Sequence, residues 1–375
     1  MGDNMNDIYL DYAATCPLSP QVKSYIIELL DTFQNPSSIY QSGINARQII
    51  NDARTSVAKF INANPDEIIF TSSGSASNTL AIRGICEKDT YTVFYSPLLH
   101  KSALKCIDDI VMFKECLKVT REGKIDIDFL KDNINILKFK PFVIIEYANS
   151  EIGTIQPVKD IIAMIHDFGG IVYVDCTGAI PSIPVDLKDL DADLIGFSAH
   201  KLGALKGCGV LYKKNNIEMK PLIYGTQENG YFGGTENLLG IASLGKSVEK
   251  YDYSSISSKN RDYVYDYIIN NIPNSYLVGA PFEHRLPHNL YMCFNGVQGE
   301  SLMILLDMND IQVSTGSACT SGDLQPSSTL TAIGMDKEDI HSCIRLSFGE
   351  ELKESDLLYI CKTINKCVQQ LRNFK

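Results

Sequence analysis

The sequence predicts an α/β protein with a mostly parallel sheet covered by helices, joined to a smaller α+β domain. The first observation is a set of short apolar runs, rich in β-branched and aromatic residues, which is typical of buried strands. The runs are residues 67–71, 91–95, 142–146, 171–175, 193–198 and 209–212. The second observation is that amphipathic stretches separate these runs, and the third is a change of pattern after about Gly245.

The stretches between the runs have helical periodicity. One places six apolar residues on a single face, namely Ile49, Ile50, Ala53, Val57, Phe60 and Ile61. Another, residues 158–170, repeats apolar residues at Ile161, Ile162, Ile165 and Phe168, and the pair Gly169–Gly170 ends it. This alternation of strands and helices favours a parallel sheet with helices on both faces.

The last third of the chain has the pattern of a second domain. The pattern of residues 246–272 predicts one long helix with Tyr-rich polar faces. It is followed by a strand at 288–294, a helix at 299–308, a Ser/Gly-rich loop at 314–323, a strand at 344–348 and a closing helix at 354–371. We therefore expect a large domain at residues 13–255, and a small domain made of residues 1–12 and 256–375.

Composition excludes several classes of protein. The 375 residues include 34 basic and 45 acidic side chains, and the net charge of -11 argues against a nucleic-acid partner. No apolar run approaches the length of a membrane span, and the acidic start resembles no secretory signal. We therefore expect a cytoplasmic protein whose 11 cysteines are mostly reduced. Without paired CxxC or HExxH motifs, we expect no bound metal.

Polar residues follow the predicted strands, where ligands bind in open α/β sheets. Ser72–Ser75 can cradle a phosphate at a helix start, or can be an ordinary capped loop. Asp175 can hold a protonated ring nitrogen or cap a turn, and Lys201 can form an imine or lie on the surface. Together, a carboxylate and a lysine 26 positions apart with a phosphate loop upstream are the equipment of a pyridoxal phosphate enzyme.

Two residues of the second domain add to this hypothesis. Cys319 lies in the small-residue loop 314–322, where a thiol can be accessible and reactive, whereas the other cysteines have apolar or helical neighbours. Arg345 lies within a predicted strand, and it can bind a substrate carboxylate or form an internal ion pair.

Many motifs, in order and over nearly the whole chain, resemble the cysteine desulfurases of the NifS/IscS group. This group belongs to class V of the fold-type-I pyridoxal phosphate enzymes. The matching segments are YLDYAAT at 9–15, NPSS at 35–38, EIIFTSSGS at 67–75, NSEIGTIQP at 149–157, VDCTGA at 174–179, FSAHK at 197–201, GTQENG at 225–230, GGTEN at 233–237, QGESL at 298–302, STGSACTSG at 314–322 and IRLSFG at 344–349.

The resemblance implies a role for individual residues. Lys201 corresponds to the Schiff-base lysine, Asp175 to the partner of the pyridine nitrogen, and His100 to the residue stacked on the ring. Phosphate contacts are implied for Gly74, Ser75, Ser198 and His200, and for Thr235 from the second subunit of a homodimer. Cofactor contacts are also expected from Asn149 and Ser150. The resemblance implies that Cys319 accepts the sulfur, that Arg345 anchors the substrate carboxylate and that Asn35 also contacts the substrate.

The implied reaction converts L-cysteine into L-alanine. Sulfur stays on Cys319 as a persulfide until an acceptor protein, such as an iron–sulfur scaffold or a thiolation enzyme, collects it.

Four positions depart from the family pattern, namely Ala76, Ser150, Gly178 and Phe232. They leave open a different class V enzyme, such as a selenocysteine lyase or an aminotransferase. They also leave open a degenerate paralogue that acts as a binding scaffold.

Overall fold

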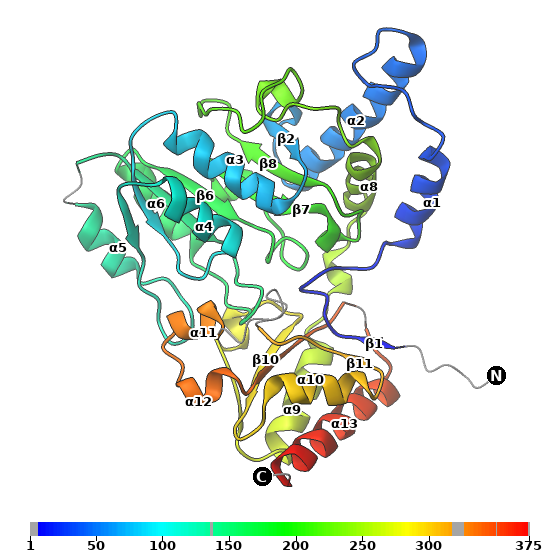
Figure 1. Cartoon of the computed structure of the whole chain (residues 1–375), viewed down its shortest axis with the longest axis vertical. Coiled ribbons are helices and arrows are strands. Elements are labelled where there is room, and N and C mark those ends of the chain that lie inside the picture. Colours follow the sequence, from blue (N-terminus) through cyan, green and yellow to red (C-terminus); the bar gives the residue numbers. More distant parts are fainter. Residues whose placement is uncertain (1–6, 136–137, 317–325, 350, 374–375) are drawn as a thin grey trace.

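A computed structural model describes residues 7–135, 138–316, 326–349 and 351–373 of the chain. Figure 1 shows a larger part, which contains the elements coloured from blue to green, above a smaller part coloured from yellow-green to red. The first short strand, near the N-terminus, lies in the smaller part (Figure 1). Among the described residues, no helix has the length and apolar character needed to span a membrane.

The larger part is built on a seven-stranded sheet with the order β2-β8-β7-β6-β5-β3-β4. All neighbouring pairs from β7 to β4 are parallel, while β8 is antiparallel to both β7 and β2. The strands are β2 (Ile68–Thr71), β3 (Thr92–Tyr95), β4 (Lys114–Cys116), β5 (Pro141–Glu146), β6 (Ile171–Asp175), β7 (Leu194–Ser198) and β8 (Gly209–Lys213). The predicted fold class is confirmed, and β4 is an additional edge strand.

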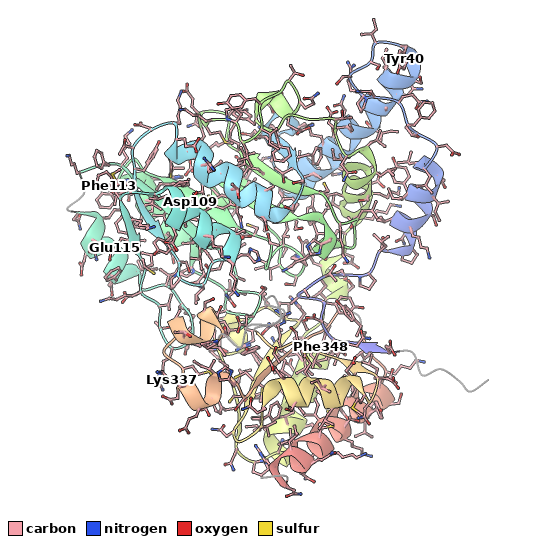
Figure 2. All side chains as sticks on the ribbon, in the orientation of Figure 1. Tyr40, Asp109, Phe113, Glu115, Lys337 and Phe348 are labelled. Atoms are coloured by element: carbon pink, nitrogen blue, oxygen red, sulfur yellow. The ribbon has the colours of Figure 1, made fainter. Side chains whose placement is uncertain are left out.

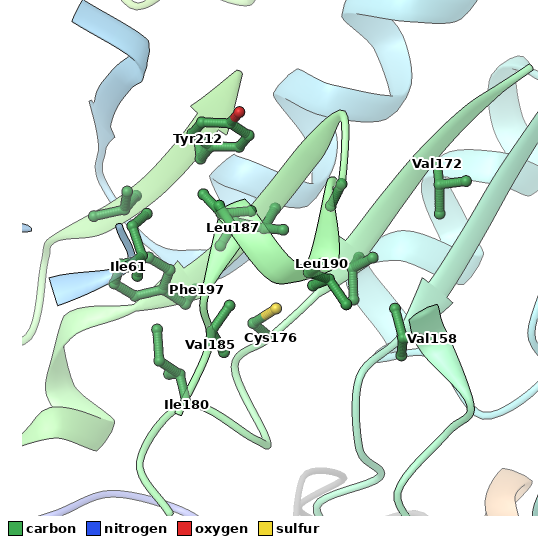
Figure 3. Packing of buried hydrophobic residues seen from close by; sticks show 14 of the residues in the cluster. Ile61, Val158, Val172, Cys176, Ile180, Val185, Leu187, Leu190, Phe197 and Tyr212 are labelled. Atoms are coloured by element: carbon green, nitrogen blue, oxygen red, sulfur yellow. The ribbon is translucent and has the colours of Figure 1, made fainter. Parts of the chain in front are cut away.

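Helices cover both faces of this sheet, and alternate residues of each strand pack against opposite layers. In β5, Phe142 and Ile144 belong to the core under α3 (Gly74–Cys86) and α4 (Lys101–Ile110). Val143 and Ile145 belong to the other core, with α2 (Gln41–Phe60), α5 (Ile127–Ile134), α6 (Val158–Asp167), α7 (Leu187–Leu190) and α8 (Leu238–Val248). Figure 3 shows part of this second layer, in which Cys176 packs among Val185, Leu187 and Phe197.

The smaller part has its own apolar core around an antiparallel sheet of order β12-β10-β9. Its strands are β9 (Ser275–Leu277), β10 (Asn289–Phe294) and β12 (Cys343–Ser347). The helices are α9 (Lys259–Asn271), α10 (Gly299–Asp307), α11 (Ser328–Ala332), α12 (Lys337–Ile340) and α13 (Glu354–Asn373). A parallel pair, β1 (Ile8–Tyr9) with β11 (Ile311–Gln312), ties the N-terminal segment to this part, and Leu10 is buried in its core.

The predicted long helix at 246–272 is wrong, because two helices share this segment. Helix α8 ends at Val248 and α9 begins at Lys259. Between them, the hydroxyls of Tyr251 and Tyr253 donate to the carbonyls of Pro181 and Ile180 at 2.6 and 3.0 Å. Both rings also pack on Phe60, so tertiary contacts override the local helical pattern. We call the larger and smaller parts the large and the small domain. A division between them at 255/256 stays our proposal, and it falls within this connection.

Candidate active site

The carboxyl ends of the parallel strands face the small domain (Figure 1). Because β5, β6 and β7 are in register, Glu146 lies beside Asp175, and Asp175 lies beside Gly196. The structure therefore brings the ends of neighbouring strands, which carry the predicted polar residues, to one edge of the sheet.

Asp175 is almost fully buried, and its carboxylate is held by two donors. Its Oδ2 accepts from Nδ2 of Asn78 at 3.0 Å, and its Oδ1 accepts from the backbone N–H of Thr177 at 2.9 Å. Asn78 also donates to Oγ of Ser102 at 3.0 Å and accepts a hydrogen bond from the Tyr173 hydroxyl. These contacts fix the orientation of an ionisable group in a water-poor place, which suits pairing with a cation.

Sequence reasoning missed Asn78, Ser102 and Tyr173. A signal existed for Asn78, because it follows Gly74 by four residues and so lies one helical turn later, on the same side of α3. No pattern in the sequence pointed to Tyr173, which looks like any apolar strand residue.

The predicted phosphate loop is an open helix start. Helix α3 begins at Gly74, and the Ser73 side chain caps it by accepting from the N–H of Ala76 at 3.1 Å. A β-carbon on Gly74 would lie 3.2 Å from Cβ of Ser198 and 3.3 Å from Oγ1 of Thr177. A glycine at this position therefore keeps backbone N–H groups, hydroxyls and a strand end close together, as a phosphate group requires.

His100 lies over the same edge. It caps α4, with Nδ1 accepting from the N–H of Ser102 at 3.2 Å and lying 2.8 Å from the Ser102 hydroxyl. Desolvation lowers the pKa of His100, the charge of Asp175 opposes this effect, and the charge of Lys201 adds to it. Although the residue keeps an exposed surface, a neutral imidazole is favoured, and a neutral ring suits stacking on an aromatic cofactor.

Lys201 lies in a single 3-10 turn, Ala199–Leu202, directly after β7. Its carbonyl accepts a hydrogen bond from the Cys16 thiol at 3.0 Å. The preceding His200 has its Nδ1 at 3.0 Å from the Thr15 hydroxyl, and desolvation lowers its pKa. The turn thus anchors the N-terminal segment on the strand end that carries the lysine.

A cavity of about 420 Å³ opens beside this turn and is lined by residues of both parts of the molecule, including Tyr12, Lys201, Tyr251, His288 and Phe348. Figure 2 labels Phe348, which lies at the junction of the two parts. His288 is buried, and desolvation, with the nearby charges of Arg345 and Lys201, lowers its pKa to about 3. Its Nδ1 has no hydrogen-bond partner among the described residues. Sequence reasoning missed this neutral imidazole.

Arg345 extends from β12 to the same junction. Its Nη2 pairs with Asp11 at 2.7 Å, and its Nη1 donates to the carbonyl of Ser150 at 3.1 Å. Its buried Nε has no partner in the part of the chain that the structure describes. The guanidinium is thus positioned by the N-terminal segment and by the turn after β5.

The turn after β5 uses Asn149 for its own geometry. The Asn149 amide donates to the carbonyl of Leu98 at 3.0 Å and accepts from the N–H groups of Glu151 and Ile152, both at 2.9 Å. A β-carbon on Gly178 would lie 2.5 Å from the carbonyl of Ala148 and 3.4 Å from Cβ of Ser150. The close approach of these backbones explains why position 178 carries no side chain.

Of three further predicted site residues, two lie elsewhere and one is not described by the structure. Cys319 is outside the described residues, but its segment leaves the described chain at Gly316, where a β-carbon would collide with the Glu151 carboxylate. Asn35 is exposed in the segment between α1 (Pro20–Leu29) and α2, and its Oδ1 accepts from the N–H of Ser37 at 2.8 Å. This segment is remote from the small domain (Figure 1). Thr235 is exposed on the loop before α8.

The residues at the strand ends fit pyridoxal phosphate. An anion cradle lies at Gly74, a held carboxylate at Asp175, a neutral ring at His100 and an amine at Lys201. Asp175 ends β6, and the other three residues directly follow the carboxyl ends of β2, β3 and β7 in the same sheet. This set of donors and the space around it agree with the cofactor expected from the motifs.

Comparison with known proteins assigns the family. Residues 8–360 match the family model described as aminotransferase class-V. The cysteine desulfurase IscS of Dictyoglomus turgidum is 36% identical over 379 residues, covering 98% of this chain and 95% of that protein. A solved NifS-like protein has a TM-score of 0.88 at 28% identity, with 97% of this chain and 100% of that chain covered.

Another solved structure, described as SspA in complex with cysteine, has a TM-score of 0.80 at 27% identity. It covers 92% of this chain and 100% of that chain. Sequence and architecture agree over nearly the whole length. This chain belongs to the class-V aminotransferase family, in the group of the cysteine desulfurases.

Proposed function

We propose that this chain is a pyridoxal phosphate-dependent cysteine desulfurase, which converts L-cysteine into L-alanine and holds the sulfur on Cys319. The observation that carries the proposal is the joint placement of Lys201, Asp175 and His100 at one sheet edge, with Arg345 at the facing domain. The family membership and a cysteine-bound structural relative support this substrate.

Each residue has a defined task in this reaction. Pyridoxal phosphate, when bound, supplies an electron sink for the substrate α-carbon. The Asp175 carboxylate balances positive charge on the ring nitrogen, and Gly74 with Ser198 shapes the phosphate cradle. Arg345 binds the substrate carboxylate, for which its Nε is available. Lys201 Nζ moves the proton of the α-carbon, which is a general acid–base role.

The sulfur step belongs to Cys319. Its thiolate attacks the sulfur of the substrate, so that an S–S bond forms while the bond between sulfur and the β-carbon breaks. The electron pair stays with carbon, which takes up a proton and becomes the methyl group of alanine. Cys319 is three residues beyond Gly316, which packs against the Glu151 carboxylate. On the other side of this segment, the side chain of Ser327 forms a hydrogen bond with Glu151.

The finer aspects of the proposal concern partners. We infer that the persulfide passes to an acceptor protein, an iron–sulfur scaffold or a thiolation enzyme, in the cytoplasm. We also infer a homodimer in which Thr235 of one subunit completes the phosphate site of the other. Exposed apolar side chains on and beside α1 and α2 support the dimer, and they include Ile27, Leu30, Phe33, Ile39 and Tyr40.

The test is to treat the holoenzyme with L-cysteine and to map sulfur by mass spectrometry of its peptides. We expect one additional sulfur on the Cys319 peptide. The Cys319→Ala variant should keep the visible absorption of the bound cofactor and lose alanine formation. The Lys201→Ala variant should lose at least about 10²-fold in alanine formation, because the α-proton has no base.

Cys116→Ser is the matched control, because Cys116 is an exposed thiol on the edge strand β4. It should form the Cys319 persulfide at the rate of the unmodified enzyme. Full alanine formation in Cys319→Ala, or added sulfur on another cysteine instead, would contradict the role of Cys319.

A further inference from the structure

Two cysteines lie directly opposite each other in the small domain. Cys293 on β10 pairs with Cys343 on β12, and on its other side Cys293 pairs with Tyr276 on β9. The N–H of the next residue, Phe294, donates to the carbonyl of Ser342, so that the neighbouring rung is the hydrogen-bonded one. Cys293 and Cys343 therefore form a non-hydrogen-bonded pair, in which Cα atoms are about 4.5 Å apart. This separation lies within the range that a disulfide spans.

The two thiols also point to the same place. The carbonyl of Asp339, on α12, lies 3.8 Å from Sγ of Cys293 and 3.4 Å from Sγ of Cys343, and both thiols donate to it. The side chains of Cys343 and Cys293 also interact with each other. Asp339 Oδ2 accepts from the Tyr276 hydroxyl at 2.7 Å, so one residue of α12 holds the whole row.

Cys293 differs from the other described cysteines in the direction in which its thiol pKa is shifted. The neighbouring side chains of Cys343 and Tyr276 lower the pKa of Cys293, although burial opposes this effect. In the nine other described cysteines the pKa is raised, mainly by burial except in Cys343, where the interaction with Cys293 is the largest cause. Thiolate character favours reaction with oxidants.

A cavity lies near this pair, although neither cysteine lines it. A cavity of about 260 Å³ is lined by residues that include Tyr276, Val278, Ile333 and Met335. Val278 and Ile333 belong to the same apolar cluster as Cys293 and Cys343, and Met335 packs against it. The cavity thus ends on the side chains that surround the two thiols.

We propose that Cys293 and Cys343 are a redox-sensitive modification site, which hydrogen peroxide converts into an intramolecular disulfide. Cys293 sulfur attacks one peroxide oxygen, the O–O bond breaks, and the hydroxide that leaves takes up a proton as water. Cys343 sulfur then attacks the sulfenic sulfur, an S–S bond forms, and the S–O bond breaks with loss of a second water. Two thiols are oxidised, and one peroxide is reduced to two waters.

The bridge lies close to the substrate side of the molecule. The next non-hydrogen-bonded rung of the same two strands joins Tyr291 to Arg345, and Tyr291 donates to the Glu151 carboxylate at 3.0 Å. A disulfide at Cys293 and Cys343 would therefore fix the strand pair that carries Arg345. It would also cross-link residues 50 positions apart in the sequence, which raises stability by restricting the unfolded chain.

The experiment maps the bond and needs no turnover, so it is independent of the proposed function. The holoenzyme is treated with hydrogen peroxide, its free thiols are alkylated under denaturing conditions, and it is digested without reductant. Mass spectrometry should find the peptides of Cys293 and Cys343 joined, and dithiothreitol should separate them. The midpoint of thermal unfolding should rise by a few degrees on oxidation and return on reduction. Alkylation of both thiols after peroxide treatment would overturn the proposal.

Two variants separate this pair from general oxidation. Cys343→Ser removes the second thiol, so dimedone should then label Cys293 as a sulfenic acid. Cys361→Ser is the matched control, since Cys361 is fully buried in the same domain, and it should leave the bridge unchanged. If Cys343→Ser does not fold, the peptide map of the unmodified protein still shows whether Cys293 and Cys343 are joined. A bridge in that map between Cys293 and any other cysteine would also contradict the assignment.

Discussion

At the scale of single residues, burial controls the charge of the polar groups behind the site. Glu146 ends β5 and lies beside Asp175 in the sheet. Its Oε1 accepts from Nε2 of Gln156 at 2.8 Å, while its Oε2 has no hydrogen-bond partner among the described residues. Desolvation raises the pKa of Glu146 from 4.5 to about 7, and the charge of Asp175 adds to this effect. A neutral Glu146 places no negative charge beside Asp175.

Glu146 should make stability depend on pH. The unfolded chain ionises this group near pH 4.5 and the folded chain near pH 7, so the folded protein holds an extra proton between these values. The free energy of unfolding therefore falls as pH rises through this window, by roughly 3 kcal/mol in total. Glu146→Gln carries no such proton. Its stability relative to the unmodified protein should rise by about that amount from pH 4.5 to pH 8 in denaturant titrations.

The control for this prediction is Ile144→Val, in the same strand and fully buried. It removes one methyl group, and its cost of about 1 kcal/mol should be the same at both pH values. If the difference in the free energy of unfolding between Glu146→Gln and the unmodified protein stayed constant across the pH range, the pKa of Glu146 would not be raised in the fold.

At the scale of elements, the strand β8 shapes the proposed phosphate cradle. Gly209 of β8 lies opposite Thr71 of β2 on one side and Ser198 of β7 on the other. A β-carbon there would collide with the backbone of Ser73, the residue that caps α3. The absence of a side chain at this position therefore sets how closely the helix start approaches the strand ends.

Gly209→Ala should weaken cofactor binding, because the Ser73 backbone must move and with it the N–H groups at the start of α3. We expect the dissociation constant of pyridoxal phosphate to rise at least about tenfold in titrations of the apoprotein. Gly169→Asn is the control. Gly169 ends α6 with a φ of 64° and open space around it, and Asn accepts this conformation. Unchanged affinity in a folded Gly209→Ala would show that the cradle tolerates the shift.

The elements also show what the sequence could predict. The buried strands and the residues that directly follow them, such as Asp175 and Lys201, were readable because apolar runs end abruptly in polar residues. The edge strand β4 was not, since its residues Lys114–Cys116 have no apolar pattern. The break between α8 and α9 was missed because contacts of Tyr251 and Tyr253 with distant residues create it. For the same reason, no local pattern could show that His288 lies buried where the charges of Lys201 and Arg345 act on it.

At the scale of the whole molecule, the apolar surface is uneven. Phe33 and Ile39 are 87% and 90% exposed, and they lie in the segment between α1 and α2. Tyr40 in the same region lies at the outer end of the large domain, away from the small domain (Figure 2). Large apolar patches on a soluble chain mark interaction surfaces. Asn35 and Thr235 are also exposed, and in the homodimer that we propose a second subunit would account for these predicted site residues.

The double variant Phe33→Asp with Ile39→Asp should dissociate the proposed homodimer. Burying such side chains stabilises an interface by roughly 1.5–3 kcal/mol each, and in a two-fold interface each of them counts twice. Charged replacements should therefore raise the dimer dissociation constant at least about a thousandfold, which sedimentation velocity would record as a monomer. Cofactor affinity should fall with it, since Thr235 then reaches no neighbouring phosphate site.

Met112→Asp with Met308→Asp is the matched control, since these side chains are 85% and 75% exposed outside the patch, and it should stay dimeric. If the variant that carries both Phe33→Asp and Ile39→Asp stayed dimeric with normal cofactor binding, the subunit contact would lie on another face of the molecule.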